Sequence, residues 1–166
     1  AAPVKQPLPV LSFPAVQLMG ITVRDLISSS DHQAQGMKLV ADRVPSAASV
    51  SLMDLSVEAE CFGSTIRVSD DEVPTVIGSI VSDEDEAQAL AVPPIGSELI
   101  TDRPVFAGVI GPFSLAGRLM DVSEAMIYCY EEPDMVHTIM EKTTAFLIEY
   151  CKAYKQAGAN GVVMAE

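Results

Sequence analysis

Residues 104–116 have the sequence Pro-Val-Phe-Ala-Gly-Val-Ile-Gly-Pro-Phe-Ser-Leu-Ala, and this stretch decides the fold. The segment from Pro104 to Ile110 is a continuous apolar run, which is typical of a strand buried on both faces of a parallel sheet. Gly111 and Pro112 then turn the chain, and Pro is favoured at the first position of a helix because no N–H is needed there. The stretch therefore predicts a buried parallel strand that passes directly into a helix.

The sequence that follows predicts one long helix and one more strand. Pro133 stands where the helix begins and Gly158 where it ends. Between them, apolar side chains recur at the three- and four-residue spacing of a buried helix face. The predicted face consists of Val136, Ile139, Met140, Thr143, Leu147, Tyr150, Cys151 and Tyr154. Residues 161–164 then begin a strand that ends at Ala165 and Glu166.

The residues before the deciding stretch predict the same alternation of strands and helices. Ser30 and Gln33 form a capping-box pattern, and Gly63 closes a shorter helix. The predicted elements are a short strand at 8–12, a helical turn at 24–28, a helix at 30–44, a strand at 48–53, a helix at 56–62 and a short strand at 65–68. Such alternation builds a parallel sheet, either open and doubly wound or closed into a barrel. The predicted fold class is α/β.

The composition is that of an acidic, apolar chain. Of 166 residues, 23 are Asp or Glu and 10 are Lys or Arg, which gives a formal charge of −13, and 49% are apolar. The apolar share favours a packed globule. The acid excess argues against binding to nucleic acid or to an anionic membrane, because phosphate contacts require clustered Lys and Arg. No apolar run reaches the roughly 20 residues that cross a bilayer.

The cysteines and the first residues bear on where the protein is found. Cys61, Cys129 and Cys151 form no CxxC pair and are too few for a disulfide framework. We expect reduced thiols in the core of a cytoplasmic protein. The start, Ala-Ala-Pro-Val-Lys, lacks an initiator Met and the regions of a secretory signal, so we expect a processed chain or a piece of a longer protein.

Three segments of the sequence carry a family resemblance. They are residues 52–63 (Leu-Met-Asp-Leu-Ser-Val-Glu-Ala-Glu-Cys-Phe-Gly), 106–116 (Phe-Ala-Gly-Val-Ile-Gly-Pro-Phe-Ser-Leu-Ala) and 158–166 (Gly-Ala-Asn-Gly-Val-Val-Met-Ala-Glu). In this order they resemble the uroporphyrinogen decarboxylase superfamily, above all its methylcobamide:coenzyme M methyltransferase branch. That family folds as a (β/α)8 TIM barrel, which needs about 250 residues. The resemblance implies that residues 1–166 are the N-terminal half of one barrel, about four βα units, with residues missing near 96–97.

The resemblance also implies where the site lies, since barrel enzymes place their chemistry at the carboxyl ends of the strands. Asp54 matches an acid that holds the substrate in the decarboxylases and is the expected catalytic residue, unless it only caps the next helix. Gly111, Phe113 and Ser114 form a turn that either binds substrate or simply places Phe113 in the core. Glu166, at the end of the last predicted strand, is a further expected substrate contact.

The expected substrate depends on the residues near the first predicted strand. The decarboxylases carry an Arg-rich segment there, which receives a substrate with eight carboxylates. Residues 12–20 of this chain contain no Arg, and Gln17 is the one match, expected to contact substrate. Arg118 is the expected anion contact, unless it is an ordinary surface Arg of a helix. The resemblance therefore favours methyl transfer over porphyrinogen decarboxylation.

The methyltransferase branch implies two cofactors, zinc and a methylated corrinoid. Zinc lowers the pKa of an acceptor thiol, which then takes the methyl group. A small-molecule substrate and a corrinoid protein are the implied partners. The family's zinc ligands lie in the second half of the barrel, and His32 and His137 have no Cys at ligand spacing, so no metal ligands are expected in this stretch. The acidic run at 83–86 is expected at the start of a helix rather than around a metal.

Three functions stay open at this point. The first is a corrinoid-dependent methyltransferase, of which this stretch alone would be inactive. The second is uroporphyrinogen decarboxylase or a decarboxylase-like lyase, which needs no cofactor. The third is a catalytically silent half-barrel fragment. A half barrel exposes two sheet edges, so we expect it to pair with its missing half or with a second copy in a homodimer.

Overall fold

The computed structural model describes residues 6–93 and 105–166. The expected break near 96–97 and the expectation for the first five residues lie outside the described residues. The helices are α1 (Pro14–Met19), α2 (Val23–Ile27), α3 (Ser30–Arg43), α4 (Val57–Cys61), α5 (Glu84–Ala89), α6 (Pro112–Met120), α7 (Val122–Glu131) and α8 (Pro133–Gln156). The strands are β1 (Ser49–Val50), β2 (Thr65–Arg67), β3 (Thr75–Ile77), β4 (Val105–Ile110) and β5 (Gly161–Ala165).

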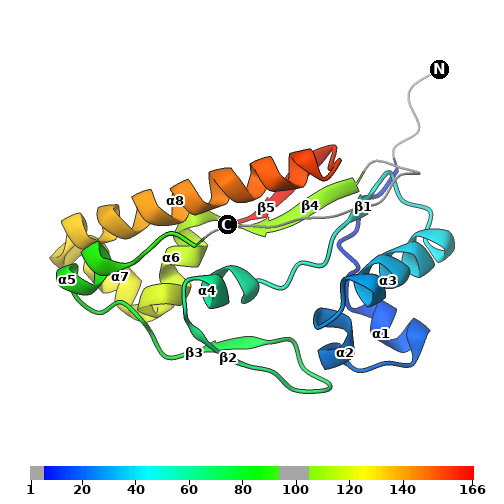
Figure 1. The fold of residues 1–166 in the computed structure, drawn as a ribbon, viewed down its shortest axis with the longest axis horizontal. Helices are drawn as coiled ribbons and strands as arrows, with labels where there is room; N and C mark the ends of the chain where they lie inside the picture. The colour runs from blue at the N-terminus through cyan, green and yellow to red at the C-terminus, as the bar shows by residue number, and fades with distance from the viewer. Residues whose placement is uncertain (1–5, 94–104) are drawn as a thin grey trace.

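A parallel sheet of order β1-β4-β5 lies at the centre of the fold (Figure 1). Val50 is opposite Phe106 at one seam, and Phe106 is opposite Gly161 at the other. The apolar run that begins the deciding stretch becomes β4, the middle strand, because a strand with neighbours on both sides is shielded from water. These parallel strands, joined by helices, confirm the predicted α/β class. β2 and β3 form a separate antiparallel pair.

β1 is shorter than the strand predicted at 48–53. The Ser51 N–H still donates to the Phe106 carbonyl, but beyond this point the N–H groups of β4 bond to side chains instead of to a neighbouring strand. The Gly108 N–H donates to Ser51 Oγ at 2.9 Å, and the Ile110 N–H donates to Glu58 Oε1 at 3.3 Å. Buried backbone donors must be paired, and β1 has already turned away at this level. The two side chains therefore complete the edge of β4.

The long helix α8 lies along the sheet and packs against α6 (Figure 1). It begins at Pro133, and Gly158 follows its end, as predicted. Its buried residues are Met135, Val136, Ile139, Thr143, Phe146 and Leu147. The predicted face omits Met135 and Phe146, although the Phe146 ring meets the Phe62 ring edge-on at 5.0 Å. No helix in the described part of the chain is both long and apolar enough to span a membrane.

The predicted strand at 8–12 does not form. Pro9 has no N–H to donate, so this segment cannot make a regular ladder. Side-chain bonds hold it beside β1 instead. Ser12 Oγ donates to the Ser51 carbonyl and accepts from the Met53 N–H, both at 3.3 Å. The segment therefore lies where the prediction places a strand, without strand geometry.

Two expectations about helices are corrected by the structure. The cysteines lie on helices but not in the core, since Cys61 and Cys129 are exposed and Cys151 is half-buried. Helical spacing alone does not tell which side of a short helix faces its neighbours. The cap of α3 is Ser29, whose side chain accepts from the His32 N–H at 3.3 Å, so the predicted cap is one residue late.

Candidate functional site

The strongest contact among the predicted site residues joins Glu166 to the turn after β4. Glu166 Oε1 accepts from the Phe113 N–H at 3.0 Å, and Oε2 accepts from the Ser114 N–H at 3.2 Å. These N–H groups belong to the first turn of α6, where a helix favours negative charge. Gly111 allows this approach because a Cβ there would collide with the Glu166 carboxylate. Four predicted residues are thus brought together at the carboxyl ends of β4 and β5.

Asp54 lies in the loop between β1 and α4 and is only 6% exposed. Its Oδ1 accepts from both the N–H and the hydroxyl of Ser56, at 3.0 and 2.6 Å. Its carbonyl accepts from the Val57 N–H at 3.3 Å. The cap residue of α4 is Ser56 rather than Asp54, so the Asp54 side chain holds the turn before the helix instead of capping it. The catalytic role of Asp54 stays a prediction.

Glu58 is the residue of this region that the sequence analysis missed. It is 3% exposed, and its Oε1 accepts the Ile110 N–H at the end of β4. Burial raises the pKa of the Glu58 carboxyl above its usual range, and the negative charge of Asp54 adds to the rise. The Ile110 N–H and the charge of Arg118 oppose it. Asp54 lies in the loop before α4, so helical spacing does not relate it to Glu58, and the five residues of α4 show no period that would point to Glu58.

We call Asp54, Glu58, Gly111, Phe113, Ser114 and Glu166 the carboxyl-end cluster. Each of these residues follows, or contacts the end of, a parallel strand. The cluster contains three carboxylates and no cation. Each of the three carboxyl groups accepts hydrogen bonds from within the chain, Asp54 from Ser56, Glu58 from Ile110 and Glu166 from the first turn of α6.

The two remaining predicted residues, Arg118 and Gln17, differ in where they lie relative to the carboxyl-end cluster. Arg118 is half-buried on α6, and its charge acts on Glu58. Gln17 is exposed on α1, and α1 packs mainly on α3. Within the described residues, therefore, Arg118 is next to the carboxyl-end cluster and Gln17 is not joined to it.

The described residues do not fit a zinc site. Across residues 6–93 and 105–166, no three side chains of His, Cys, Asp or Glu are grouped closely enough to hold a metal ion. Structural and catalytic zinc sites need three or four such ligands. The acidic run at 83–86 lies at the start of α5, where the Asp83 side chain accepts from the Glu86 N–H at 2.8 Å. This confirms its predicted place at a helix start.

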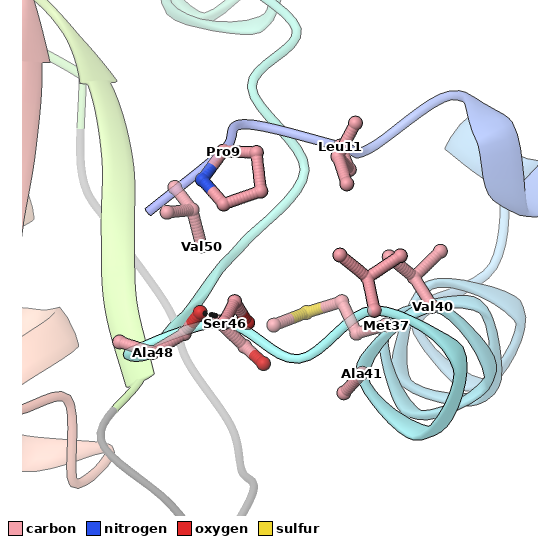
Figure 2. A pocket seen from close by; sticks show the side chains of 10 residues that line it. Pro9, Leu11, Met37, Val40, Ala41, Ser46, Ala48 and Val50 are labelled. Atoms are coloured by element: carbon pink, nitrogen blue, oxygen red, sulfur yellow. Dashed lines mark hydrogen bonds between the residues drawn. The ribbon is translucent and has the colours of Figure 1, made fainter. Parts of the chain in front are cut away.

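A small, mostly apolar cavity lies between the segment at 9–11, α3 and β1 (Figure 2). Its volume is about 20 Å³, which is room for about one water molecule. Pro9 and Leu11 stand on one side of it and Met37 and Val40 on the other (Figure 2). None of the predicted site residues lines this cavity, so it is not the candidate site.

The sheet and the cluster together define a class of protein. Parallel strands joined by helices, with acidic side chains and a glycine turn at the carboxyl ends, are the architecture of α/β barrel enzymes. The chain belongs to the uroporphyrinogen decarboxylase family: the family model "Uroporphyrinogen decarboxylase (URO-D)" matches residues 5–166. This finding confirms the resemblance found in the sequence.

A solved methyltransferase from Methanosarcina mazei has a similar fold, with a TM-score of 0.80 and 19% sequence identity. The match covers 98% of this chain and 54% of the methyltransferase, so this chain has the α/β fold of about half a (β/α)8 barrel. A curated uroporphyrinogen decarboxylase from Helicobacter acinonychis (strain Sheeba) is 32% identical over 73 residues. That match covers 40% of this chain and 22% of the decarboxylase. The chain thus spans about half the length of the solved relative and less of the curated one.

Proposed function

We propose that the protein carrying this chain is a methyltransferase that moves a methyl group from a methylated corrinoid to a thiol or a similar acceptor. The observation that carries the proposal is the position of Glu166. Its carboxylate takes the two N–H groups at the start of α6, where an anionic group of a substrate would otherwise bind. Glu166 therefore occupies, with a negative charge, a position where a substrate with many carboxylates would need positive charge.

Several basic side chains are already engaged inside the chain. Arg24 Nε is 2.8 Å from Asp70 Oδ1, and Lys142 Nζ donates to three backbone carbonyls at the end of α5. Arg118 is half-buried on α6 beside the buried Glu58. This distribution does not favour a porphyrinogen with eight carboxylates, which requires Arg or Lys free to face it. Decarboxylation is therefore the second candidate, supported by the curated relative.

The roles of the site residues in this proposal follow their positions. Asp54 is the proposed catalytic carboxylate, which accepts hydrogen bonds from N–H or O–H groups of the bound substrate and orients it. Phe113 supplies an apolar wall, and Gly111 lets the backbone approach a ligand closely. The fold of the Methanosarcina mazei methyltransferase supports the class of reaction.

The cofactors and partners belong to the proposal through the resemblance. The described residues do not fit zinc, so no step is assigned to zinc in this half of the barrel. A methylated corrinoid, held by a corrinoid protein, remains the proposed methyl donor. The three free cysteines support the proposal of a reducing compartment such as the cytoplasm.

The edge of β5 that has no neighbouring strand in the described residues supports the proposal that further strands pair with it. β5 is the last strand of the parallel sheet in the described residues, and Val162 and Met164 on it are 39% and 49% exposed. An open strand edge with apolar side chains pairs readily with further strands. Since the match covers 54% of the solved relative, the proposed cover is the remaining half of a barrel, with a second copy as the alternative.

The test uses the purified protein at its natural length. Methylcobalamin is mixed with a thiol, and the loss of the methylcobalamin absorbance is followed with time, with thiol-free and protein-free controls. We expect a loss of absorbance that requires both protein and thiol. In parallel, uroporphyrinogen is supplied and carbon dioxide is measured. Release of carbon dioxide without methyl transfer would establish the decarboxylase alternative, and neither reaction would support the silent half barrel.

A further inference from the structure

We propose that Glu58 is a positioning residue that ties the Asp54 loop to the carboxyl end of β4, and that its buried, unpaired Oε2 favours the neutral acid as the form that holds this tie. The catalytic part of this inference rests on the proposed function, because the two segments that Glu58 joins carry Asp54 and the Gly111 turn. The tie itself does not depend on which reaction the protein performs.

The geometry of the tie spans a long stretch of sequence. Glu58 follows Asp54 by four residues, and its Oε1 accepts the N–H of Ile110, the residue directly before Gly111. α4, which carries Glu58, packs against α6, which starts from the Gly111 turn (Figure 1). One side chain therefore sets the spacing between the Asp54 loop and the turn that holds Glu166.

The burial of Glu58 favours the neutral acid over the ionised carboxylate in the folded protein. Its Oε2 is buried without a hydrogen-bond partner among the described residues, and an ionised carboxylate tolerates such an unpaired oxygen less well than a neutral acid does. The groups that face it are Asp54 from the preceding loop, Cys61 on its own helix, Arg118 on α6 and Tyr150 on α8. Burial has the largest effect and raises the pKa of the Glu58 carboxyl, and the charge of Asp54 raises it further, while the backbone N–H groups of Glu58 and Ile110 and the charge of Arg118 lower it.

The first experiment measures the tie without using the reaction. In the full-length protein, Glu58→Gln keeps an acceptor oxygen for Ile110 but cannot ionise, and Glu60→Gln, on the exposed side of the same helix, is the matched control. The folded pKa of Glu58 lies above its unfolded value, so wild-type stability falls as the pH rises from the unfolded value through the folded one. We expect the urea midpoint of Glu58→Gln to lack this decline and that of Glu60→Gln to keep it.

Hydrogen exchange at Ile110 gives a second readout of the tie. Glu58→Ala should raise the exchange rate of this amide by about tenfold or more, and Glu58→Gln should leave it within about threefold of wild type. Unchanged exchange in Glu58→Ala, or a pH decline in Glu58→Gln equal to that of wild type, would overturn the proposal. The urea denaturation and the hydrogen exchange can both be measured whichever reaction the protein catalyses.

The activity profile then tests the positioning role. We expect kcat for methyl transfer to fall with rising pH in wild type and to stay level in Glu58→Gln, while Glu58→Ala lowers kcat about tenfold with little change in KM. A folded but inactive Glu58→Gln would mean that the ionised form is needed, which contradicts the proposal. If the stability and exchange measurements give the expected results but the protein transfers no methyl group, the role of Glu58 as a tie stands and only the proposed function is refuted.

Discussion

At the scale of single residues, Gly111 is required because it leaves room for the Glu166 carboxylate, and not because of an unusual backbone conformation. Its φ of −79° and ψ of 158° are accessible to any residue. A side chain is excluded because the Glu166 carboxylate lies where a Cβ would stand. The same carboxylate is held by the N–H groups of Phe113 and Ser114. Gly111 and Glu166 therefore depend on each other.

Substitution of Gly111 tests this dependence. Gly111→Ala should displace the Glu166 side chain and lower the free energy of unfolding by about 1–3 kcal/mol, as overpacking does. Gly117→Ala, inside α6, is the matched control. A Cβ at Gly117 would meet Cγ2 of Val122, the first residue of α7, at an ordinary 3.5 Å. The control should raise stability by about 0.5–1 kcal/mol, because Ala favours a helix over Gly. Chemical denaturation measures both, and equal stability of the two variants would contradict the placement of Glu166.

At the scale of elements, the short helix α5 depends on a lysine from α8. A six-residue helix is too short to be stable alone. Lys142 Nζ donates to the carbonyls of Ala87, Gln88 and Leu90 at 2.6, 2.5 and 2.7 Å, which satisfies the free carbonyls at the end of α5. α5 is thereby fixed to the long helix at its carboxyl end.

Lys142→Met keeps the aliphatic stem and removes the three hydrogen bonds. We expect a loss of about 1–2 kcal/mol in the free energy of unfolding, because three carbonyls, two of them part-buried, lose a charged donor. Lys152→Met on the same helix removes only an exposed ion pair with Glu149, so its effect should stay below about 0.5 kcal/mol. Thermal unfolding distinguishes the two, and a Lys142→Met variant as stable as Lys152→Met would show that α5 needs no such clamp.

The elements that the sequence predicted well are those with a strong local pattern. The apolar run of β4 and the proline-bounded, periodic helix α8 formed where expected. Residues 8–12 did not form a strand because Pro9 removes a ladder donor, which the pattern of apolar residues hides. Glu58 was missed because α4 has five residues, too few for a period to show which side is buried.

At the scale of the whole molecule, the parallel arrangement explains why predicted site residues far apart in sequence meet. Gly111, Phe113, Ser114 and Glu166 were expected at one rim because parallel strands end on the same side, and they are in contact. Gln17 could not be placed this way, since the segment before it is not a strand of the sheet. The family was accessible from the order of three motifs, whereas composition alone gave only an acidic globule.

The central claim is that the carboxyl-end cluster performs the chemistry, and Asp54→Asn in the full-length protein tests it most directly. Asn keeps an oxygen for the Ser56 N–H and hydroxyl, so the fold should be preserved, while the negative charge is lost. The account predicts that kcat/KM for methyl transfer falls by about 10²-fold or more with an unchanged melting temperature, and that Asp85→Asn on the exposed start of α5 has no effect. Full activity in a folded Asp54→Asn variant would show that Asp54 only holds the turn before α4 and would contradict the account.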